Sequence, residues 1–290
     1  MTHAMQHETM PDGRNKIRSG VSRKLAVGCV SYLNAKPLIY GFEKSCDAKL
    51  RLEVPSKLLD GIVKKEYDVA LLPVIDYQRA PGLCLLPVGG IGCDGPTLTV
   101  RIFSKVPIEQ IRILKCDTDS HTSVALARVI LAELHGLEPK CVDCRFGPTN
   151  ESEKSDDDHV ARLLIGDKVV CDEPRGFPYQ LDLGAGWKQL TGLPFVFAIW
   201  TARQGVDLLD LPQQLNACRQ QGLLHLDEII AEHATSLGWP TDLAKQYLGS
   251  YLKFEIGELQ IKAIARFHEL AAKWKVIEGV PRVLKMYGEN

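Results

Sequence analysis

The chain has 290 residues, of which 45% are hydrophobic and 24% are charged, and its formal net charge at pH 7 is -1. A chain of this length and composition can bury a large core, as one large domain or as two smaller ones. The near-neutral charge excludes a general attraction to nucleic acid or to an anionic membrane surface, which requires a basic face, so small-molecule chemistry is the expected class of function.

The N-terminal residues 1–23 mix charged, polar and glycine residues and contain no apolar run of signal-peptide length. We expect them to form a flexible extension. No window approaches the ~20 consecutive apolar residues of a membrane helix, so the expected location is the cytoplasm. The nine cysteines are expected to be reduced thiols. Cys141 and Cys144 are a close pair without a second pair at ligand spacing, and no metal site is expected.

Strands and helices alternate in the first part of the chain. The apolar run at 25–30 is typical of a buried parallel strand, and the elements expected after it are a helix at 37–45, a strand at 49–54, a helix at 55–65 and a strand at 68–73. Asn34 then lies on the turn between the first strand and a helix opened by Pro37, at the edge of the sheet where ligands bind. Its amide either faces a ligand or only caps the helix.

Residues 96–102 alternate with period two, which places Thr97, Thr99 and Arg101 on one face of a predicted strand. This polar face either lines a cleft or is half exposed to solvent.

A second unit of the same kind follows. It is expected to contain a strand at 111–116, a helix at 123–134 that Gly136 ends, a strand at 142–146, a helix at 158–164 leading into the apolar run 169–171, and a strand at 195–200. The acidic stretch 149–158 is predicted to be a solvated loop. Ser120, Thr122 and Ser123 lie where a strand passes into a helix, and hydroxyls beside free helix N–H groups suit the binding of an anion. The alternative is that one of them is only an N-cap.

Only helices are predicted after residue 203, at 211–221, 226–237, 241–248 and 257–273. The apolar residues of the last helix recur at helical spacing and are interpreted as core. Two α/β units followed by a helical return indicate two lobes with a cleft between them.

Several strings of the chain occur in the order that they have in the chorismate dehydratase family, which begins the futalosine route to menaquinone. They are VSYLNAKPL at 30–38, DVALLPVIDY at 68–77, GPTLTV at 95–100, DTDSHTS at 117–123, LIGD at 164–167, DLGAGW at 182–187 and PFVFAIW at 194–200. The resemblance covers residues 25–200, and the helical tail is similar in character only.

The resemblance implies a type 2 periplasmic-binding-protein fold, an α/β architecture of two lobes with the ligand cleft between them and a helical C-terminal tail. We place the two crossings of the chain near residues 102 and 202. Residues 24–102 and 203–290 would then form lobe 1, and residues 103–202 lobe 2.

The implied reaction is the loss of water from C3 and C4 of chorismate to give 3-[(1-carboxyvinyl)oxy]benzoate, with no cofactor. Asn34 is the implied catalytic residue. Thr99 corresponds to a family hydroxyl that contacts the substrate, although serine is common at that position. The expected substrate-binding residues are Tyr32, Thr97, Thr99, Ser120, Thr122 and Ser123.

No motif supplies a convincing acid or base. Histidine suits general base catalysis, but His121 in a helix-opening turn is interpreted as passive. Asp167 and Asp182 are interpreted as stabilising the lobes rather than as an acid–base pair. The site is therefore expected to bind and position an anion, and the substrate's own side-chain carboxylate is a candidate for the base.

Two alternatives remain open. The sister enzyme that makes 1,4-dihydroxy-6-naphthoate shares the fold, but its opening motif resembles SPCPND rather than SYLNAKPL. A solute-binding protein or sensor domain for a small carboxylate would use the same cleft without turnover. The expected partner is a small dicarboxylate, with neither nucleic acid nor membrane, and the protein is expected to be a monomer or a homodimer.

Overall fold

A computed structural model describes residues 23–146, 157–171 and 174–289. Most of the N-terminal extension and of the acidic stretch 149–158 therefore lie outside the described residues. Within the described part, no helix is both long enough and apolar enough to cross a bilayer.

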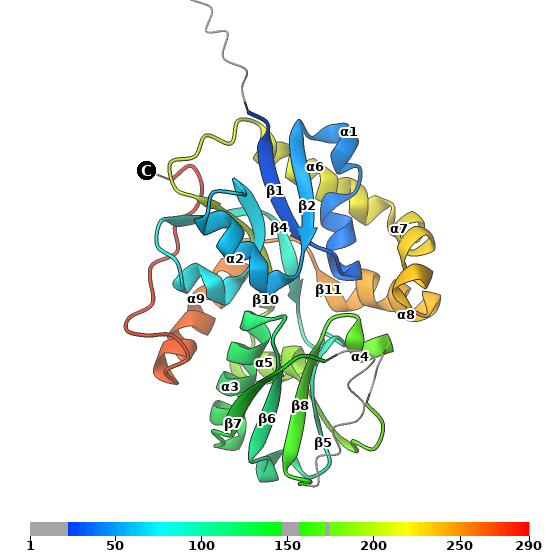
Figure 1. Ribbon diagram of the computed structural model, residues 1–290, viewed down its shortest axis with the longest axis vertical. Helices are drawn as coiled ribbons and strands as arrows, with labels where there is room; N and C mark the ends of the chain where they lie inside the picture. The colour runs from blue at the N-terminus through cyan, green and yellow to red at the C-terminus, as the bar shows by residue number, and fades with distance from the viewer. Residues whose placement is uncertain (1–22, 147–156, 172–173, 290) are drawn as a thin grey trace, which may run out of the picture.

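The structure contains two β-sheets, and we call each sheet with its covering helices a lobe (Figure 1). The first sheet has the strand order β11-β4-β10-β3-β1-β2. Its strands are β1 (Leu25–Val30), β2 (Ala48–Glu53), β3 (Val69–Pro73), β4 (Leu83–Cys93), β10 (Phe195–Arg203) and β11 (Leu252–Lys253). β1 pairs in parallel with β2 and β3, whereas β10 is antiparallel to both β3 and β4. The predicted parallel unit at the start of the chain is thus present.

The second sheet has the order β7-β6-β8-β5-β9. Its strands are β5 (Val100–Ser104), β6 (Ile113–Asp117), β7 (Lys140–Cys144), β8 (Val160–Ile165) and β9 (Tyr179–Asp182). β8 occupies residues predicted to be a helix. It is the central strand, parallel to β6 and antiparallel to β5, and burial between these neighbours decides its conformation. The following run 168–171 is a short helix, α4 (Lys168–Cys171).

Helices cover both sheets, and the C-terminal helices return to the first lobe (Figure 1). The helices are α1 (Phe42–Ser45), α2 (Pro55–Val63), α3 (His121–His135), α5 (Leu183–Thr191), α6 (Leu211–Leu224), α7 (Leu226–His233), α8 (Thr241–Gln246) and α9 (Glu258–Lys273). The 3₁₀ segments are η1 (Leu33–Ile39), η2 (Val74–Gln78), η3 (Ile108–Gln110) and η4 (Thr235–Leu237), and η5 (Tyr247–Tyr251) is a π-helix. Gly136 ends α3 in the left-handed conformation, as predicted.

The chain crosses between the lobes earlier than predicted. All of β5 (100–104) pairs within the second sheet, so the first crossing precedes residue 100 rather than lying near 102. β10 (195–203) lies inside the first sheet, so the return precedes residue 195 rather than lying near 202. The expected lobe boundaries 24–102, 103–202 and 203–290 shift accordingly. An apolar pattern indicates a strand but does not show which strand it pairs with. β10 belongs to the first lobe because it pairs with β3 and β4.

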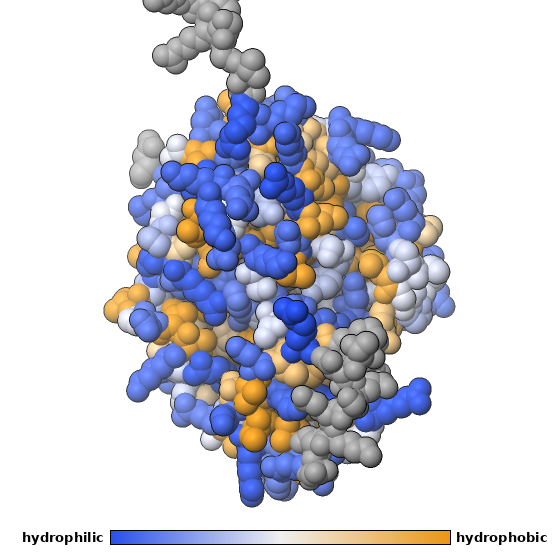
Figure 2. All heavy atoms as spheres, in the orientation of Figure 1, coloured by the Kyte–Doolittle hydropathy of each residue, from blue (hydrophilic) through white to orange (hydrophobic). Residues whose placement is uncertain are grey.

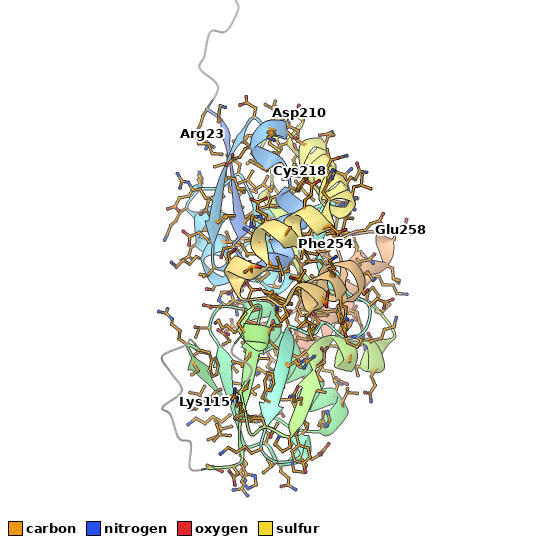
Figure 3. The ribbon with its side chains drawn as sticks, turned by 90° about the vertical axis from the view of Figure 1, so that its right-hand side faces the viewer. Arg23, Lys115, Asp210, Cys218, Phe254 and Glu258 are labelled. Carbon is orange, nitrogen blue, oxygen red and sulfur yellow. The ribbon has the colours of Figure 1, made fainter. Side chains whose placement is uncertain are left out.

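The buried residues form one cluster that extends through both lobes, with a small second cluster around Phe103. Figure 3 shows Cys218 on α6 in the upper lobe, Phe254 after β11 nearer the level where the lobes meet, and Lys115 on β6 in the lower lobe. Figure 2, which has the orientation of Figure 1, shows a face covered mainly by hydrophilic residues, with hydrophobic residues in small patches among them. The continuous core indicates that the lobes are packed against each other.

His268 on α9 is buried beneath η2 and is held as a neutral imidazole. Its Nε2 lies 2.9 Å from the carbonyl oxygen of Val74, and its Nδ1 lies 2.9 Å from Nε2 of Gln78. Nε2–H therefore donates to the carbonyl, and Nδ1 accepts from the amide. Burial lowers the pKa of His268 from 6.5 to about 4, the Val74 carbonyl opposes this change, and the charge of Arg282 adds to it.

This burial predicts an acid-labile contribution to stability. Because the folded-state pKa lies below the unfolded one, the contribution is complete above pH 6.5 and is lost as the pH falls toward 4. The loss amounts to about 3 kcal/mol. Urea unfolding of the wild type and of His268→Gln at a series of pH values measures this loss of stability. On acidification the free energy of unfolding of the variant should fall by about 3 kcal/mol less than that of the wild type. The other titrating groups are common to both proteins, so identical pH profiles would contradict the prediction.

Candidate active site

A cavity lies between the two lobes, with about 560 Å³ of space that protein atoms do not fill, including its open side. Residues of both sheets line it, among them Leu71 of β3 and Val100 of β5. Its hydrogen-bonding side chains are Tyr32, Asn34, Thr97, Thr99, Ser120, Ser123 and Tyr247, and the remaining lining is Val30, Pro55, Leu71, Pro73, Ile91, Val100, Ile165, Gly166, Phe197, Ala198 and Leu252. The cavity is thus an apolar chamber with neutral polar groups set into its wall.

Of the seven residues predicted to form the site, six lie in this wall. Thr122 does not line the cavity. Its Oγ1 accepts a hydrogen bond of 3.4 Å from the backbone N–H of Ile75 on η2, which ties α3 to the other lobe. Successive residues at a helix start point in different directions, and only Ser120 and Ser123, three residues apart, share the face toward the cavity. Thr122 is therefore a lobe contact and not a cavity residue.

Asn34 lies in η1, directly after β1, at the carboxyl edge of the first sheet. Its Nδ2 donates a hydrogen bond of 3.4 Å to the hydroxyl of Tyr247, and its buried Oδ1 has no partner. η1 has no side-chain cap hydrogen bond, so the alternative role of Asn34 as a helix cap is wrong. Pro37, expected at the first turn of an α-helix, lies inside this 3₁₀ segment.

Tyr247 is a cavity residue that the sequence did not reveal. It begins the π-helix η5 and is 1% exposed, and its hydroxyl lies 2.7 Å from Oγ1 of Thr99. The two residues are 148 positions apart and belong to different lobes. An aromatic residue in a C-terminal helical stretch is indistinguishable from core by its pattern. The feature that distinguishes Tyr247 from an ordinary core residue is the π-helical turn, which is common at functional sites. That turn is visible only in the structure.

The threonines of the predicted strand 96–102 reach the cavity through a tight turn rather than through strand alternation. Leu98 has a φ of 68°, and the N–H of Thr99 donates to the carbonyl oxygen of Thr97 at 2.8 Å, which closes a three-residue γ-turn. Asp182 stabilises this strained turn, because its carboxylate accepts from the backbone N–H groups of Thr97, Leu98 and Ala185 at 2.9–3.1 Å. Asp182 therefore has a structural role, as predicted.

The N-terminus of α3 faces the cavity with two serines. Ser120 is the N-cap, and its Oγ accepts from the N–H of Ser123 at 3.2 Å and donates to the Oγ of Ser123 at 2.9 Å. The proton of the Ser123 hydroxyl then remains free for a ligand. With the partial positive charge of a 15-residue helix, this corner is suited to a carboxylate.

Tyr32 connects the cavity wall to an ion cluster of the second lobe. Its hydroxyl donates to Oδ2 of Asp119 at 3.5 Å, and the Nζ of Lys168 lies 2.7 Å from the same oxygen and 2.8 Å from Oδ2 of Asp117. Burial raises the pKa of the Tyr32 phenol, and the nearby carboxylates raise it further. The charge of Lys168 is paired with the carboxylates of Asp117 and Asp119. The cluster therefore positions Tyr32 without placing a net positive charge at the cavity.

Asp167 and His121, considered above as acid or base, lie outside the cavity and tie the lobes together. Asp167 accepts from Nε1 of Trp239 at 2.9 Å, and burial raises the pKa of its carboxyl group. Nδ1 of His121 lies 2.9 Å from the carboxylate of Asp76 on η2, a group with no exposed surface. Neither side chain lines the cavity. Asp167 links the lobes, in line with the stabilising role predicted for it, whereas His121 is paired with a buried carboxylate instead of being a passive surface residue.

The lining residues have little acid or base chemistry to offer. They include no Asp, Glu, His, Lys or Arg, and the two phenols are their only titrating groups. The described part of the chain also contains no group of three or more His, Cys, Asp or Glu side chains placed to hold a metal ion. What the wall provides is hydrogen-bond donors, a helix N-terminus and shape, which suit the binding and orientation of an anion.

Two α/β lobes joined by two crossings, with a chamber between them, define a protein of the periplasmic-binding-protein fold. Solved structures support this class. A protein of Archaeoglobus fulgidus matches with a TM-score of 0.69 at 16% identity, over 89% of this chain and 100% of that one. The alkanesulfonate-binding protein of Xanthomonas axonopodis pv. citri, solved with bound MOPS, matches with a TM-score of 0.62 at 12% identity, over 88% and 94% of the two chains.

The sequence narrows this class to one family. A model of the menaquinone biosynthesis family matches residues 25–273, and the chain belongs to that family. A relative from Thermus thermophilus, named chorismate dehydratase, is 28% identical over 264 residues, which cover 84% of this chain and 94% of the relative. The family to which the sequence motifs pointed is thereby confirmed.

Proposed function

We propose that this protein is a lyase that removes water from chorismate and yields 3-[(1-carboxyvinyl)oxy]benzoate, the first step of futalosine-dependent menaquinone biosynthesis. The observation that carries the proposal is the chamber itself, which is lined by six motif residues and contains no charged side chain. The name of the Thermus thermophilus relative supports the substrate and the reaction. Removal of water is redox-neutral, so the proposed reaction needs no redox cofactor. We expect it to proceed without any cofactor and in the cytoplasm.

Chorismate carries two carboxylates, and the chamber has two polar corners that suit them. Ser120 and Ser123, with the N-terminus of α3, would hold one carboxylate. Thr97 and Thr99, which border the strained turn at Leu98, would hold the other. Binding by neutral donors leaves the dianion without a salt bridge, so its position depends on the shape of the chamber and on closure of the lobes.

The base in this proposal is the substrate. No lining side chain other than a phenol can accept the C3 proton, and the phenols carry their protons because burial raises the pKa of both Tyr32 and Tyr247. The carboxylate of the enolpyruvyl side chain is attached next to C3. If the chamber folds this side chain over the ring, the carboxylate reaches the proton and the protein needs only to fix the conformation.

Three experiments test this function. Purified protein incubated with chorismate should produce a compound lighter by one water molecule, with the absorbance of an aromatic ring. His121→Ala should keep most of the wild-type kcat, because His121 lies outside the chamber. A chorismate analogue with an amide in place of the side-chain carboxylate should bind but not react. Loss of kcat in folded His121→Ala, or normal turnover of the amide analogue, would place the base on the protein instead.

The same assay separates the alternative functions. A solute-binding or sensor domain would bind chorismate without consuming it. A 1,4-dihydroxy-6-naphthoate synthase would leave chorismate intact. The opening motif of this chain, SYLNAKPL, also differs from the SPCPND motif of that enzyme. Gel filtration with light scattering decides between the monomer and the homodimer that we expect.

A further inference from the structure

The phenol of Tyr247 is held in one orientation at the wall of the chamber. Its ring stacks on Trp239, with the ring centroids 4.8 Å apart and the planes inclined by 16°. Nε1 of Trp239 in turn donates to Asp167 of the other lobe at 2.9 Å. The hydroxyl of Tyr247 is therefore positioned by contacts with both lobes when they are packed together, as a group that acts on a bound ligand requires.

Counting protons shows that the hydroxyls are not all satisfied. Nδ2 of Asn34 donates to the Tyr247 oxygen, and one hydrogen bond of 2.7 Å joins Tyr247 to Thr99. That bond uses one of the two hydroxyl protons, so one buried O–H donor remains without an acceptor. Oδ1 of Asn34 is a buried acceptor without a donor. Nδ2 of Asn34 has a second N–H that neither of these hydrogen bonds uses. The three residues together therefore offer two spare donors and one spare acceptor.

An alcohol hydroxyl meets both needs, because its oxygen accepts up to two hydrogen bonds and its proton can go to Oδ1 of Asn34. A carboxylate would satisfy only the spare donors, since it has no proton to give to Oδ1 of Asn34. Leaving a buried polar group unpaired costs about 1–3 kcal/mol. The Asn34–Thr99–Tyr247 group is thus complementary to an alcohol, and chorismate has one alcohol, which is the group that departs in the proposed reaction.

We propose that Tyr247 is a catalytic residue which, paired with Thr99, donates a proton to the C4 hydroxyl of chorismate as it leaves, while Oδ1 of Asn34 accepts from that hydroxyl and orients it. This inference rests on the proposed dehydration. It assigns to one side chain the acid that the motifs did not supply. It also leaves the second carboxylate of the substrate to Thr97, because the Thr99 hydroxyl is then paired with Tyr247.

The step balances without any further reactant. The C3–H bond breaks, its proton passes to the side-chain carboxylate of the substrate, and its electron pair forms the new bond between C3 and C4. The C4–O bond breaks and its electron pair leaves on oxygen, which takes the proton from the Tyr247–Thr99 pair and departs as water. The carboxylic acid formed on the substrate returns a proton to the pair.

Tyr247→Phe tests the inference, because it keeps the ring stacked on Trp239 and removes only the hydroxyl. Removal of a donor to developing negative charge lowers kcat by about 10²–10³-fold, and the KM for chorismate should change by much less. The product has no alcohol, so its affinity in titration calorimetry should equal that of the wild type. Tyr251→Phe, which removes a second phenol from the same π-helix outside the chamber, is the matched control and should keep the wild-type kcat.

Further variants keep the inference falsifiable if Tyr247→Phe does not fold. Thr99→Val should reproduce the loss of kcat, Thr99→Ser should restore most of it, and the double variant should be little worse than either single variant, since the two hydroxyls act as one unit. A wild-type kcat in Tyr247→Phe or in Thr99→Val overturns the inference. A variant that keeps its kcat and binds both chorismate and the product more weakly overturns it as well. Failure of the wild type to dehydrate chorismate would instead overturn the proposed function.

Discussion

Replacing Asn34 by aspartate is expected to leave the protein folded and to reduce kcat/KM on chorismate by at least ~10²-fold. The new carboxylate would face a dianionic substrate in a chamber whose wall contains no cation. Two like charges about 6 Å apart, at an effective dielectric constant of about 20, repel by about 3 kcal/mol, which corresponds to roughly two powers of ten in rate. The variant also loses the Nδ2 donor to Tyr247, so its carboxylate would compete for the phenol proton.

Steady-state kinetics with a thermal unfolding check measures this effect. Asn216→Asp is the matched control, because Asn216 on α6 uses its Oδ1 to accept from Arg219 at 2.9 Å and aspartate preserves that acceptor. It should keep the wild-type kcat/KM. An Asn34→Asp protein that is folded and fully active would remove Asn34 from the site.

Substituting alanine for Gly222 is expected to destabilise the protein by more than about 3 kcal/mol, beyond the range usual for overpacked cores. Gly222 on α6 packs directly on the backbone of η1. An added Cβ would lie 2.7 Å from Cα of Pro37 and closer still to its carbonyl oxygen, so backbone rather than a flexible side chain must move. Pro37 is three residues from Asn34 in the same short 3₁₀ segment, and the fraction that folds should therefore lose activity as well.

Urea unfolding at pH 7 and kcat/KM on chorismate test the two parts of this expectation. Gly249→Ala is the control, since no heavy atom lies within 4 Å of its added Cβ and its φ is not positive. The control should unfold at the wild-type urea concentration or slightly above it. If Gly222→Ala matched that stability, α6 and η1 would not be in close contact in solution.

Local patterns were sufficient for the elements whose burial is uniform along their length. The run 25–30 is buried over nearly its whole length in β1, and 68–73 gives β3, because a strand covered on both faces selects apolar residues at every position. The start of α3 and its end at Gly136 follow from hydroxyls and glycine with defined capping geometry. The last helix follows from its apolar periodicity. The prediction that only helices follow residue 203 is wrong, because β11 (252–253) pairs with β4.

Local patterns failed where a distant partner sets the conformation. Residues 160–165 form the central strand of the second sheet, because β5 and β6 pair with them from both sides. α5 was not expected, because Gly184 and Gly186 lower helix propensity. A Cβ at Gly184 would lie 2.5 Å from the carbonyl oxygen of Gly95, so the close packing of this helix on the crossing segment requires glycine.

The sequence by itself determined the class of fold, the family and six side chains of the chamber wall, because its motifs lie at strand ends and helix starts, where short-range geometry is fixed. Only the tertiary structure decided where the chain crosses between lobes, that Thr122 turns away from the chamber, and that Tyr247 enters it. The contact between Tyr247 and Thr99 joins residues 148 positions apart. No local propensity encodes such a contact, because it exists only when both lobes and the C-terminal helices are packed together.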